Sequence, residues 1–189
     1  MVKSKTYKKN IVCLEALWDQ DVENRLTVLP ILELTAKASR VKTIFMTCNT
    51  LAELEHNLKI ARRMRGYGIL YFAFHGSPGK IHLDGSTVEL ELLSFFMEKH
   101  FKNWIVHFDS CAALRVKKSR IRRFLDETGI LMLTGYKRRV DWMESAALGL
   151  LFLDWIQRYK NMRIFWERFR NTYTTLTRST GIRAFYRDL

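Results

Sequence analysis

The sequence predicts an α/β fold, a three-layer α-β-α sandwich with a mainly parallel central sheet. Two observations predict it. Short runs rich in β-branched and aromatic residues alternate along the chain with longer segments whose apolar residues recur at helical spacing. One of these runs, residues 69–74 (ILYFAF), is apolar at every position, which is typical of parallel strands that helices cover on both faces.

Strands are predicted where apolar, β-branched and aromatic residues form short runs. These segments are residues 11–18, 41–47, 69–74, 80–83, 104–108 and 130–134. The run at 80–83 ends at Asp84-Gly85, which is a turn signal. We therefore expect this run to be a hairpin arm or a short extra strand beside the main sheet.

Helices are predicted where apolar residues recur every three or four positions. These segments are residues 26–39, 50–65, 90–101, 119–128, 142–159 and 162–176. Pro30 lies near the start of the first helix, where proline is tolerated. Thr50 and Glu53 have the spacing of a capping box, and Gly66 is suited to end the helix that begins there.

The chain is expected to form one folded domain. A length of 189 residues is normal for a single domain with a substantial buried core. No linker rich in glycine, serine or proline divides the chain, and no internal repeat is present. We expect a basic N-terminal tail at residues 1–10 and a single domain at residues 11–189.

Basic residues outnumber acidic residues. Lysine and arginine total 32 against 19 aspartate and glutamate, which gives a net charge of +13 and a sequence pI near 9.9. Such a surplus suits an acidic partner, but no nucleic-acid-binding motif accompanies it. The simpler interpretation is a basic enzyme in which residues 115–123 and 137–139 form a solvated face; the alternative is a docking surface for an acidic partner or substrate.

The remaining composition argues against several classes of protein. Three cysteines do not make a disulfide framework, and the N-terminus lacks the apolar core of a signal peptide. The longest apolar stretch, residues 146–156, contains Asp154 and is too short to span a bilayer. We expect a cytoplasmic protein without a membrane span. The histidines and cysteines lack metal-ligand spacing, so no metal and no cofactor is predicted.

Two predicted strands each end at a reactive side chain. The run at 69–74 leads directly into His75-Gly76, and the run at 104–108 leads into Asp109-Ser110-Cys111. The carboxyl ends of parallel strands share one sheet edge, where such folds have their functional crevice. A strand-helix-strand crossover brings its two strands near each other, so we expect His75 and Cys111 to meet.

This pair of residues is suited to nucleophilic catalysis. An imidazole at residue 75 can take the proton of the Cys111 thiol as it attacks a carbonyl, and later protonate the leaving amine. The resulting oxyanion needs donors, and the amides of Gly76 and Cys111 are the candidates. Taken alone, a cysteine at a strand end is more typical of a core residue. The joint placement with His75 favours the catalytic interpretation.

The order of strand, His75-Gly76, strand and Asp109-Ser110-Cys111 in a small α/β domain resembles the caspase-like cysteine peptidases, which include caspases, metacaspases, separase and the bacterial CHAT-type proteases. The segment 135–147 resembles the part that follows the next strand in the bacterial members. The resemblance covers roughly residues 11–159. It implies His75 as general base and acid, Cys111 as nucleophile, and the Gly76 and Cys111 amides as oxyanion hole, without an obligatory third acid.

The sequence also departs from the best-known members of this family. The Gln-Ala-Cys-Arg-Gly motif of animal caspases is absent, and no glycine follows Cys111. These departures favour the bacterial and separase-like branch of the family. They also argue against specificity for aspartate. Related members use an acidic pocket residue to accept a basic P1 residue, the substrate residue before the cleaved bond.

Two acidic residues are candidates for that pocket. Asp141 is the first, since a carboxylate there would bind a guanidinium or an ammonium group. Asp141 is equally suited to cap the helix that begins at Trp142. Glu144 is the second candidate, with a surface position as its alternative. Asp109 is expected to satisfy loop amides or to orient the site.

The sequence therefore predicts a cysteine endopeptidase that cleaves protein or peptide substrates, with cleavage after Arg or Lys as the first expectation. The resemblance implies a role in bacterial antiviral defence or regulated cell death, with an activating or effector protein as partner. Two other classes stay open. One is a catalytically silent caspase-like module that binds a partner through its basic face. The other is a basic nucleic-acid-binding protein.

Overall fold

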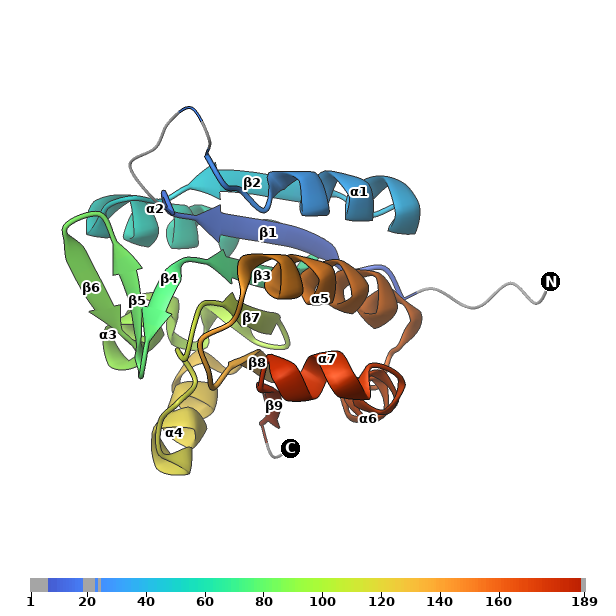
Figure 1. Ribbon diagram of the computed structural model, residues 1–189. Helices are drawn as coiled ribbons and strands as arrows, with labels where there is room; N and C mark the ends of the chain where they lie inside the picture. The colour runs from blue at the N-terminus through green and yellow to red at the C-terminus, as the bar shows by residue number, and fades with distance from the viewer. Residues whose placement is uncertain (1–6, 19–22, 24, 188–189) are drawn as a thin grey trace.

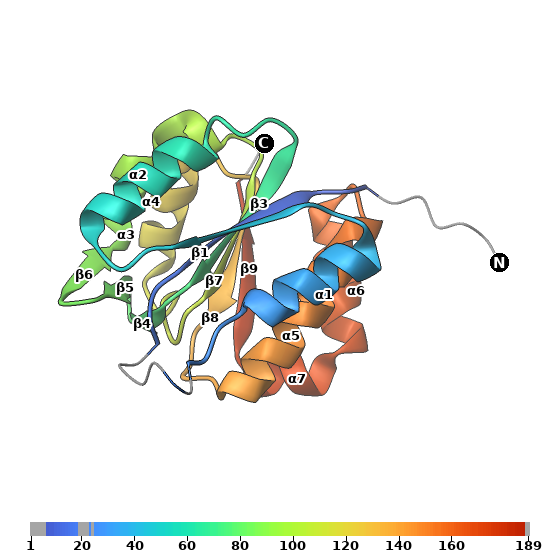
Figure 2. The ribbon, with the colours of Figure 1, turned by 90° about the horizontal axis from the view of Figure 1, so that it is seen from above.

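A six-stranded sheet separates two layers of helices (Figures 1 and 2). The computed structural model describes residues 7–18, 23 and 25–187. In order across the sheet, the strands are β2 (Thr43–Thr47), β1 (Asn10–Glu15), β3 (Tyr67–Ala73), β7 (Ile105–Asp109), β8 (Met132–Tyr136) and β9 (Ile182–Tyr186). The first five are parallel, and β9 runs antiparallel to β8 at the edge.

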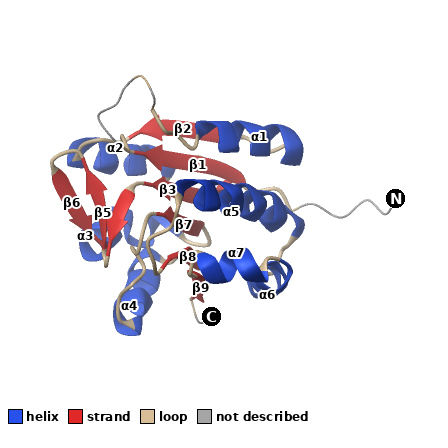
Figure 3. Cartoon of the chain, in the orientation of Figure 1, coloured by secondary structure: helices blue, strands red, loops and turns tan. Residues whose placement is uncertain are grey.

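A three-stranded antiparallel sheet follows β3 directly. Its strands are β4 (His75–Ser77), β5 (Lys80–Leu83) and β6 (Ser86–Glu89), drawn beside the main sheet in Figure 3. The hairpin predicted at residues 80–83 is therefore present, with β4 and β6 as its neighbours. Because β4 begins at His75, this small sheet carries the predicted catalytic histidine.

The two helical layers differ in content, as the view in Figure 2 shows. One layer holds α2 (Leu51–Ala61), α3 (Leu90–Met97) and α4 (Lys118–Thr128). The other holds α1 (Leu29–Ser39), α5 (Trp142–Trp155), α6 (Met162–Thr172) and α7 (Thr174–Ser179). Short 3-10 helices, η1 (Glu98–Phe101) and η2 (Ile156–Arg158), extend α3 and α5.

Side chains alternate between the two faces of the sheet, so each strand contributes to a hydrophobic core on either side. Leu70 and Phe72 of β3 pack into the core beneath α2, α3 and α4. Ile69 and Tyr71 pack into the core beneath α1, α5 and α6. All four side chains are fully buried, which explains why the strand is apolar at successive positions. The predicted three-layer α/β sandwich is therefore confirmed.

Several element boundaries differ from the predictions. The first strand ends at Glu15 instead of residue 18, and the predicted helix at 162–176 divides into α6 and α7 at Tyr173. The capping box is confirmed: the Glu53 N–H donates to the Thr50 hydroxyl at 3.2 Å, and the Thr50 N–H donates to the Glu53 carboxylate at 2.9 Å. The edge strand β9 was not predicted.

The N-terminal segment joins the fold earlier than the predicted tail boundary. Residues 1–6 lie outside the described residues, but β1 begins at Asn10. The Lys9 ammonium donates to the carbonyls of Tyr7, Ile156 and Tyr159 at 2.9, 2.9 and 2.8 Å. Lys9 thus binds carbonyls at the end of α5 and η2, which fixes the chain immediately before β1.

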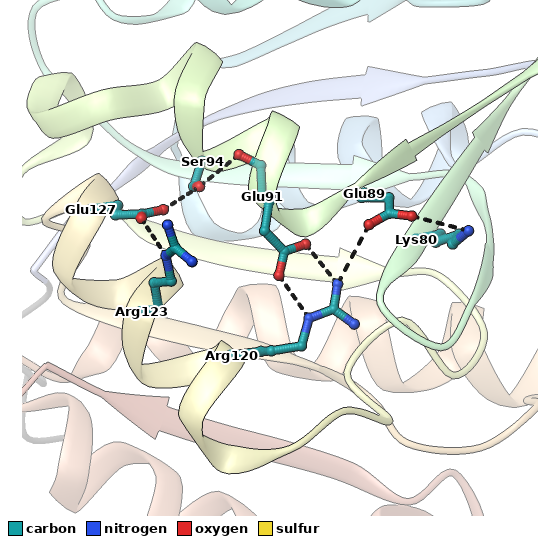
Figure 4. Close-up of polar contacts among 7 residues, drawn as sticks. All are labelled: Lys80, Glu89, Glu91, Ser94, Arg120, Arg123 and Glu127. Atoms are coloured by element: carbon teal, nitrogen blue, oxygen red, sulfur yellow. Dashed lines mark hydrogen bonds and ion pairs between the residues drawn. The ribbon is translucent and has the colours of Figure 1, made fainter.

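A network of ion pairs joins α4 to α3 and to β6 (Figure 4). The Arg120 guanidinium binds Glu91 through two hydrogen bonds of 2.7 and 2.6 Å, and it lies 3.9 Å from the Glu89 carboxylate. Arg123 and Glu127 form a further pair along α4 at 2.7 Å. Because α4 follows the turn that holds Cys111, this network fixes the far end of that turn.

No helix among the described residues is long and apolar enough to cross a membrane. Within the same residues, no group of three or more histidine, cysteine, aspartate or glutamate side chains is arranged to hold a metal ion. Cys13 and Cys48 are free and buried, whereas Cys111 is free and half-buried.

Candidate functional site

Three neighbouring strands end at the same level of the sheet. Ala73 of β3 pairs with Glu15 of β1 on one side and with Asp109 of β7 on the other. His75 lies two residues beyond Ala73, and Cys111 lies two residues beyond Asp109. The parallel register therefore carries the imidazole and the thiol to one edge, as the sequence predicted.

The backbones that carry these two side chains are in close contact. A Cβ atom added to Gly76 would lie 2.7 Å from the Cys111 carbonyl oxygen and 3.2 Å from the Cys111 nitrogen. Such distances leave no room for a side chain, so glycine at position 76 permits the approach. The amide of Cys111 meets no hydrogen-bond acceptor in the described part of the chain. The residues predicted as oxyanion donors therefore lie together.

The imidazole of His75 is held by Trp18, which follows β1. Nε2 of His75 hydrogen-bonds to the Trp18 carbonyl oxygen. The two rings meet edge to face, with centroids 5.1 Å apart. A carbonyl only accepts, so Nε2 carries the proton and, in the neutral imidazole, Nδ1 carries the lone pair. His75 is otherwise exposed, and this contact sets its tautomer and orientation.

Glu15 in turn holds Trp18. Its carboxylate is fully buried at the end of β1 and accepts the Trp18 indole N–H at 2.9 Å. It also accepts the Val28 N–H at 2.7 Å and the Thr27 hydroxyl at 2.6 Å. A chain of contacts thus runs from a buried carboxylate through Trp18 to the imidazole of His75.

The thiol of Cys111 lies against Val140, in the segment between β8 and α5. The Val140 N–H donates to the sulfur at 3.4 Å, and the Val140 carbonyl oxygen lies 3.7 Å from the same sulfur. Directly after Cys111, Ala112 has a positive φ of 55°, and its N–H donates to the Arg138 carbonyl at 2.8 Å. This turn reverses the chain and leaves the thiol half-exposed. No hydrogen bond joins His75 to Cys111 among the described residues, as is common before substrate binds.

A cavity of about 180 Å³ opens beside these residues. His75 and Cys111 both line it, and Trp18, Val140 and Trp142 supply much of its apolar wall. Its complete lining is Trp18, Leu26, His75, Asp109, Ser110, Cys111, Tyr136, Val140, Trp142 and Ser145. The Ser110 hydroxyl is buried and has no hydrogen-bond partner among the described residues. The cavity therefore holds His75 and Cys111 together with a serine whose buried hydroxyl is unsatisfied among the described residues.

A buried carboxyl group forms part of the cavity wall. Asp109 is 4% exposed, and it accepts hydrogen bonds from the Tyr71 hydroxyl at 2.6 Å and from the Ser145 hydroxyl. The Tyr136 hydroxyl lies 3.0 Å from that of Ser145. Burial raises the pKa of Asp109, and the hydrogen bonds from Ser145 and Tyr71 oppose this rise. These donors are hydroxyl groups, whereas the sequence indicated loop amides.

Space for this cluster comes from a glycine within α5. A Cβ atom at Gly149 would lie 2.7 Å from the Tyr71 hydroxyl oxygen. The hydroxyl that supports Asp109 therefore occupies volume that any other residue at position 149 would fill.

The two predicted pocket acids lie elsewhere. Asp141 is exposed and caps α5, where its carboxylate accepts the N–H groups of Met143 at 2.9 Å and Glu144 at 3.2 Å. This is the capping role that the sequence also allowed. Glu144 lies in the first turn of α5, and neither acid lines the cavity beside Cys111.

The other histidines near the site are less suited to act as a base. His107 is fully buried on β7 and stacks on Phe152 with centroids 4.9 Å apart. Burial lowers the pKa of His107 to about 3, so it is neutral at ordinary pH. His82 lies 3.0 Å from the Ser77 hydroxyl, and burial followed by the nearby charge of His75 lowers its pKa.

Sequence reasoning missed two parts of this site. Trp18 contributes a backbone carbonyl, which no residue type reveals, although its position after the first strand places it at the same sheet edge. Asp109 was recognised as close to Cys111 but not as part of the cavity wall. The alternation of β7 could have indicated this, since Asp109 shares a face with Ile105 and points toward α5.

Comparison with known proteins identifies a family for this chain but indicates no activity. The model of a family of unknown function, DUF6642, matches residues 8–186. No curated protein matches the chain.

Proposed function

Since the chain belongs to the family of unknown function DUF6642, its chemistry is inferred from its own residues, and we propose that it is a cysteine endopeptidase with His75 and Cys111 as its catalytic dyad. One observation carries this proposal. An imidazole, held in one tautomer by a backbone carbonyl, and a half-exposed thiol line the same cavity at the carboxyl edge of a parallel sheet. The resemblance to caspase-like peptidases agrees with this placement.

In the first step, Cys111 Sγ attacks the carbonyl carbon of the scissile peptide bond, and the thiol proton moves to His75 Nδ1. The imidazolium that forms keeps its Nε2–H bond to the Trp18 carbonyl. His75 then returns the proton to the leaving amine as the C–N bond breaks. Water next attacks the thioester, with His75 as general base, and releases the acid product and the free thiol.

The oxyanion of the tetrahedral intermediate forms next to the Cys111 amide. That amide meets no acceptor among the described residues, and Gly76 packs against it. We assign these two N–H groups as the oxyanion donors. Loss of one such donor typically costs about 100-fold to 1,000-fold in kcat.

Asp109 supports cleavage after a basic residue. Its carboxyl lies in the cavity wall next to the nucleophile, whereas Asp141 caps a helix outside the cavity. An arginine or lysine side chain entering the cavity would pair with a buried carboxylate, which favours the charged form of Asp109. The P1 preference is therefore assigned to Asp109 in place of Asp141 and Glu144. An activating partner, and a role in bacterial antiviral defence or regulated cell death, stay predictions from the resemblance.

A panel of fluorogenic peptides that differ only at P1 tests the proposal. The wild-type protein should hydrolyse peptides with Arg or Lys at P1 faster than those with Asp or Leu. Cys111→Ala and His75→Ala should each abolish hydrolysis. Asp109→Asn should reduce the preference for Arg over Leu at least tenfold, about 1.4 kcal/mol, while Asp141→Asn should leave it unchanged.

Labelling by a peptide-derived covalent inhibitor provides a readout that does not depend on turnover. Mass spectrometry should place the adduct on Cys111 and not on the buried Cys13 or Cys48. His75→Ala should slow the labelling. Absence of both hydrolysis and Cys111-selective labelling would contradict the proposal and favour a catalytically silent binding module.

A further inference from the structure

The edge strand β9 has an open side. In an antiparallel ladder, residues alternate between pairs that exchange hydrogen bonds and pairs that do not. The Arg187 N–H donates to the Leu131 carbonyl and the Lys137 N–H donates to the Gly181 carbonyl, at 3.4 and 3.3 Å. The bonded pairs therefore involve the odd-numbered residues of β9. The N–H and C=O groups of Ala184 point away from β8, and no described residue hydrogen-bonds to them.

The same alternation applies to the other even-numbered residues. The backbone groups of Tyr186 also point outward and have no partner in the described part of the chain. At Ile182 the outward carbonyl accepts from the Arg183 side chain at 3.3 Å. Ala184 and Tyr186, two positions apart on β9, therefore present unpaired backbone donors and acceptors at the sheet edge.

A groove runs along this open edge. One cavity of about 410 Å³ lies beside the start of α6, and another of about 690 Å³ lies beside α4. Both are lined by Arg163, Tyr186 and Arg187, so together they flank β9 on both faces of the sheet. We call these two cavities and the open edge between them the β9 groove.

The β9 groove is strongly basic. Five basic side chains and one acidic side chain line it: Lys118, Arg122, Lys160, Arg163, Arg187 and Asp126. Of these, Lys118, Arg122 and Lys160 have no carboxylate within ion-pair distance among the described residues. The Arg187 guanidinium donates to the Gly129 carbonyl at 2.8 Å, and that of Arg163 lies over the Tyr186 ring at 4.7 Å. The groove therefore has positive charge on both sides of the unpaired edge of β9.

We propose that the β9 groove binds an extended acidic segment of a partner protein, which adds to the sheet as a strand beside β9. Its backbone would pair with Ala184 and Tyr186. Side chains of the added strand alternate between the two faces of the sheet. Acidic side chains on one face would meet Lys118 and Arg122 of α4, and those on the other face would meet Lys160 at the start of α6.

Charge and the unpaired backbone groups together distinguish this occupant from two others. A second copy that paired through its own β9 would place two basic grooves side by side, which is unfavourable. Nucleic acid would be attracted by the same charges but would not use the alternating backbone groups of Ala184 and Tyr186. An acidic peptide strand satisfies both features. This inference does not depend on the peptidase activity.

Fluorescence anisotropy with a defined probe tests the inference. The probe is a labelled peptide, Glu-Glu-Val-Thr-Glu-Glu-Val-Thr-Glu-Glu, which places glutamate on both faces of a strand. The protein is the full chain carrying Cys111→Ala, so that no cleavage consumes the probe. A second peptide has the same sequence and charge but carries N-methyl groups on four central backbone nitrogens, two on each edge. The unmodified peptide should bind at least ten times more tightly.

Matched variants locate the binding surface. Lys118→Glu with Arg122→Glu should weaken binding of the unmodified peptide at least tenfold. Arg63→Glu with Arg65→Glu changes the net charge equally, at exposed residues beyond α2, and should change binding less than threefold. Ala184→Pro removes the outward N–H at a position where an edge strand tolerates proline, and it should also weaken binding. Circular dichroism confirms that each variant is folded.

Three results would overturn the inference. Equal binding of the methylated and unmodified peptides would show that charge alone attracts the probe. Displacement of the peptide by a single-stranded oligonucleotide that binds more tightly would assign the groove to nucleic acid. A dimer in sedimentation velocity that Ala184→Pro converts to monomer would assign β9 to contacts between copies.

Discussion

Asp109 makes folding stability depend on pH in a defined direction. Burial raises the pKa of its carboxyl above the ordinary value of 3.8, so the folded protein binds this proton more tightly than the unfolded chain does. The stability that this group contributes is complete below the ordinary pKa and is lost as the pH rises through the raised pKa. The carboxyl therefore destabilises the folded protein once it ionises at its buried position.

Asp109→Asn should remove this dependence. The free energy of unfolding of the wild type minus that of Asp109→Asn should fall as the pH rises from about 4 to about 8. Urea denaturation at a series of pH values measures this difference. Asp141→Asn is the control, because its carboxyl is exposed and asparagine also caps helices. A difference that stays constant across the series for Asp109→Asn would contradict the prediction.

Under the proposed function, we expect Glu15 to be a positioning residue that acts through Trp18. Glu15→Ala would leave the N–H groups of Trp18 and Val28 without their acceptor, which should lower the free energy of unfolding by about 1–3 kcal/mol. It should also lower kcat, since the Trp18 carbonyl would no longer hold His75. Glu15→Gln retains an acceptor oxygen and should restore most of both. Thermal unfolding and peptide hydrolysis measure the two effects, and unchanged kcat in a folded Glu15→Ala protein would exclude this role.

At the scale of elements, the Arg120 network connects the turn after Cys111 to the small sheet that carries His75. Arg120 packs over Gly79, where an added Cβ atom would lie 2.7 Å from Nη1, and it pairs with Glu91 on α3. Gly79 has a positive φ of 77° at the tip of the β4–β5 hairpin. One side chain of α4 thus contacts both the β4–β5 hairpin and α3.

Arg120→Met should lower the free energy of unfolding by about 1 kcal/mol at low salt, and by less in 1 M NaCl, because the pairs are partly exposed and screened. Chemical denaturation at both salt concentrations measures the change. Lys59→Met is the control, since Lys59 pairs with Glu55 within a single exposed turn of α2. Its effect should stay below about 0.5 kcal/mol. Equal losses for the two variants would show that the network adds nothing beyond one surface pair.

Helices and strands could be predicted from the sequence where one clear residue pattern indicated them. The buried strands β3 and β7 are apolar at most positions, and α2 combines helical spacing with a capping box. The strand β9 was missed because the exposed Arg183 interrupts its apolar residues and only Ile182 is fully buried. The strand β4 was missed because only three residues, two of them polar, pair with β5.

For the molecule as a whole, the net charge of +13 opposes compactness. Five basic side chains, including Lys118 and Arg122 of α4, line the β9 groove alone. We expect the free energy of unfolding to rise as NaCl increases from about 0.02 to about 0.3 M, because screening acts on repulsion over this range. A melting temperature that falls with added salt would show that attractive pairs dominate.

The fold and the placement of His75 and Cys111 at one sheet edge could be predicted because both depend on strand order. Parallel strands release His75 and Cys111 at one edge whatever the details of the loops. The acid that we propose for the substrate pocket could not be predicted in the same way. Asp109 lies two residues before Cys111 and Asp141 directly precedes α5, and only three-dimensional packing shows that the first is buried beside the cavity and the second caps a helix.

Gly149 has a consequence for any attempt to make this protein more robust. Glycine within a helix is about 1 kcal/mol less favourable than alanine, so a survey of α5 would select this position first for replacement. The added methyl group would meet the hydroxyl of Tyr71 and so displace the support of Asp109. At position 149, alanine would favour the stability of the helix, whereas glycine leaves room for the Tyr71 hydroxyl beside the cavity. The protein has glycine, the residue that preserves the shape of the cavity wall.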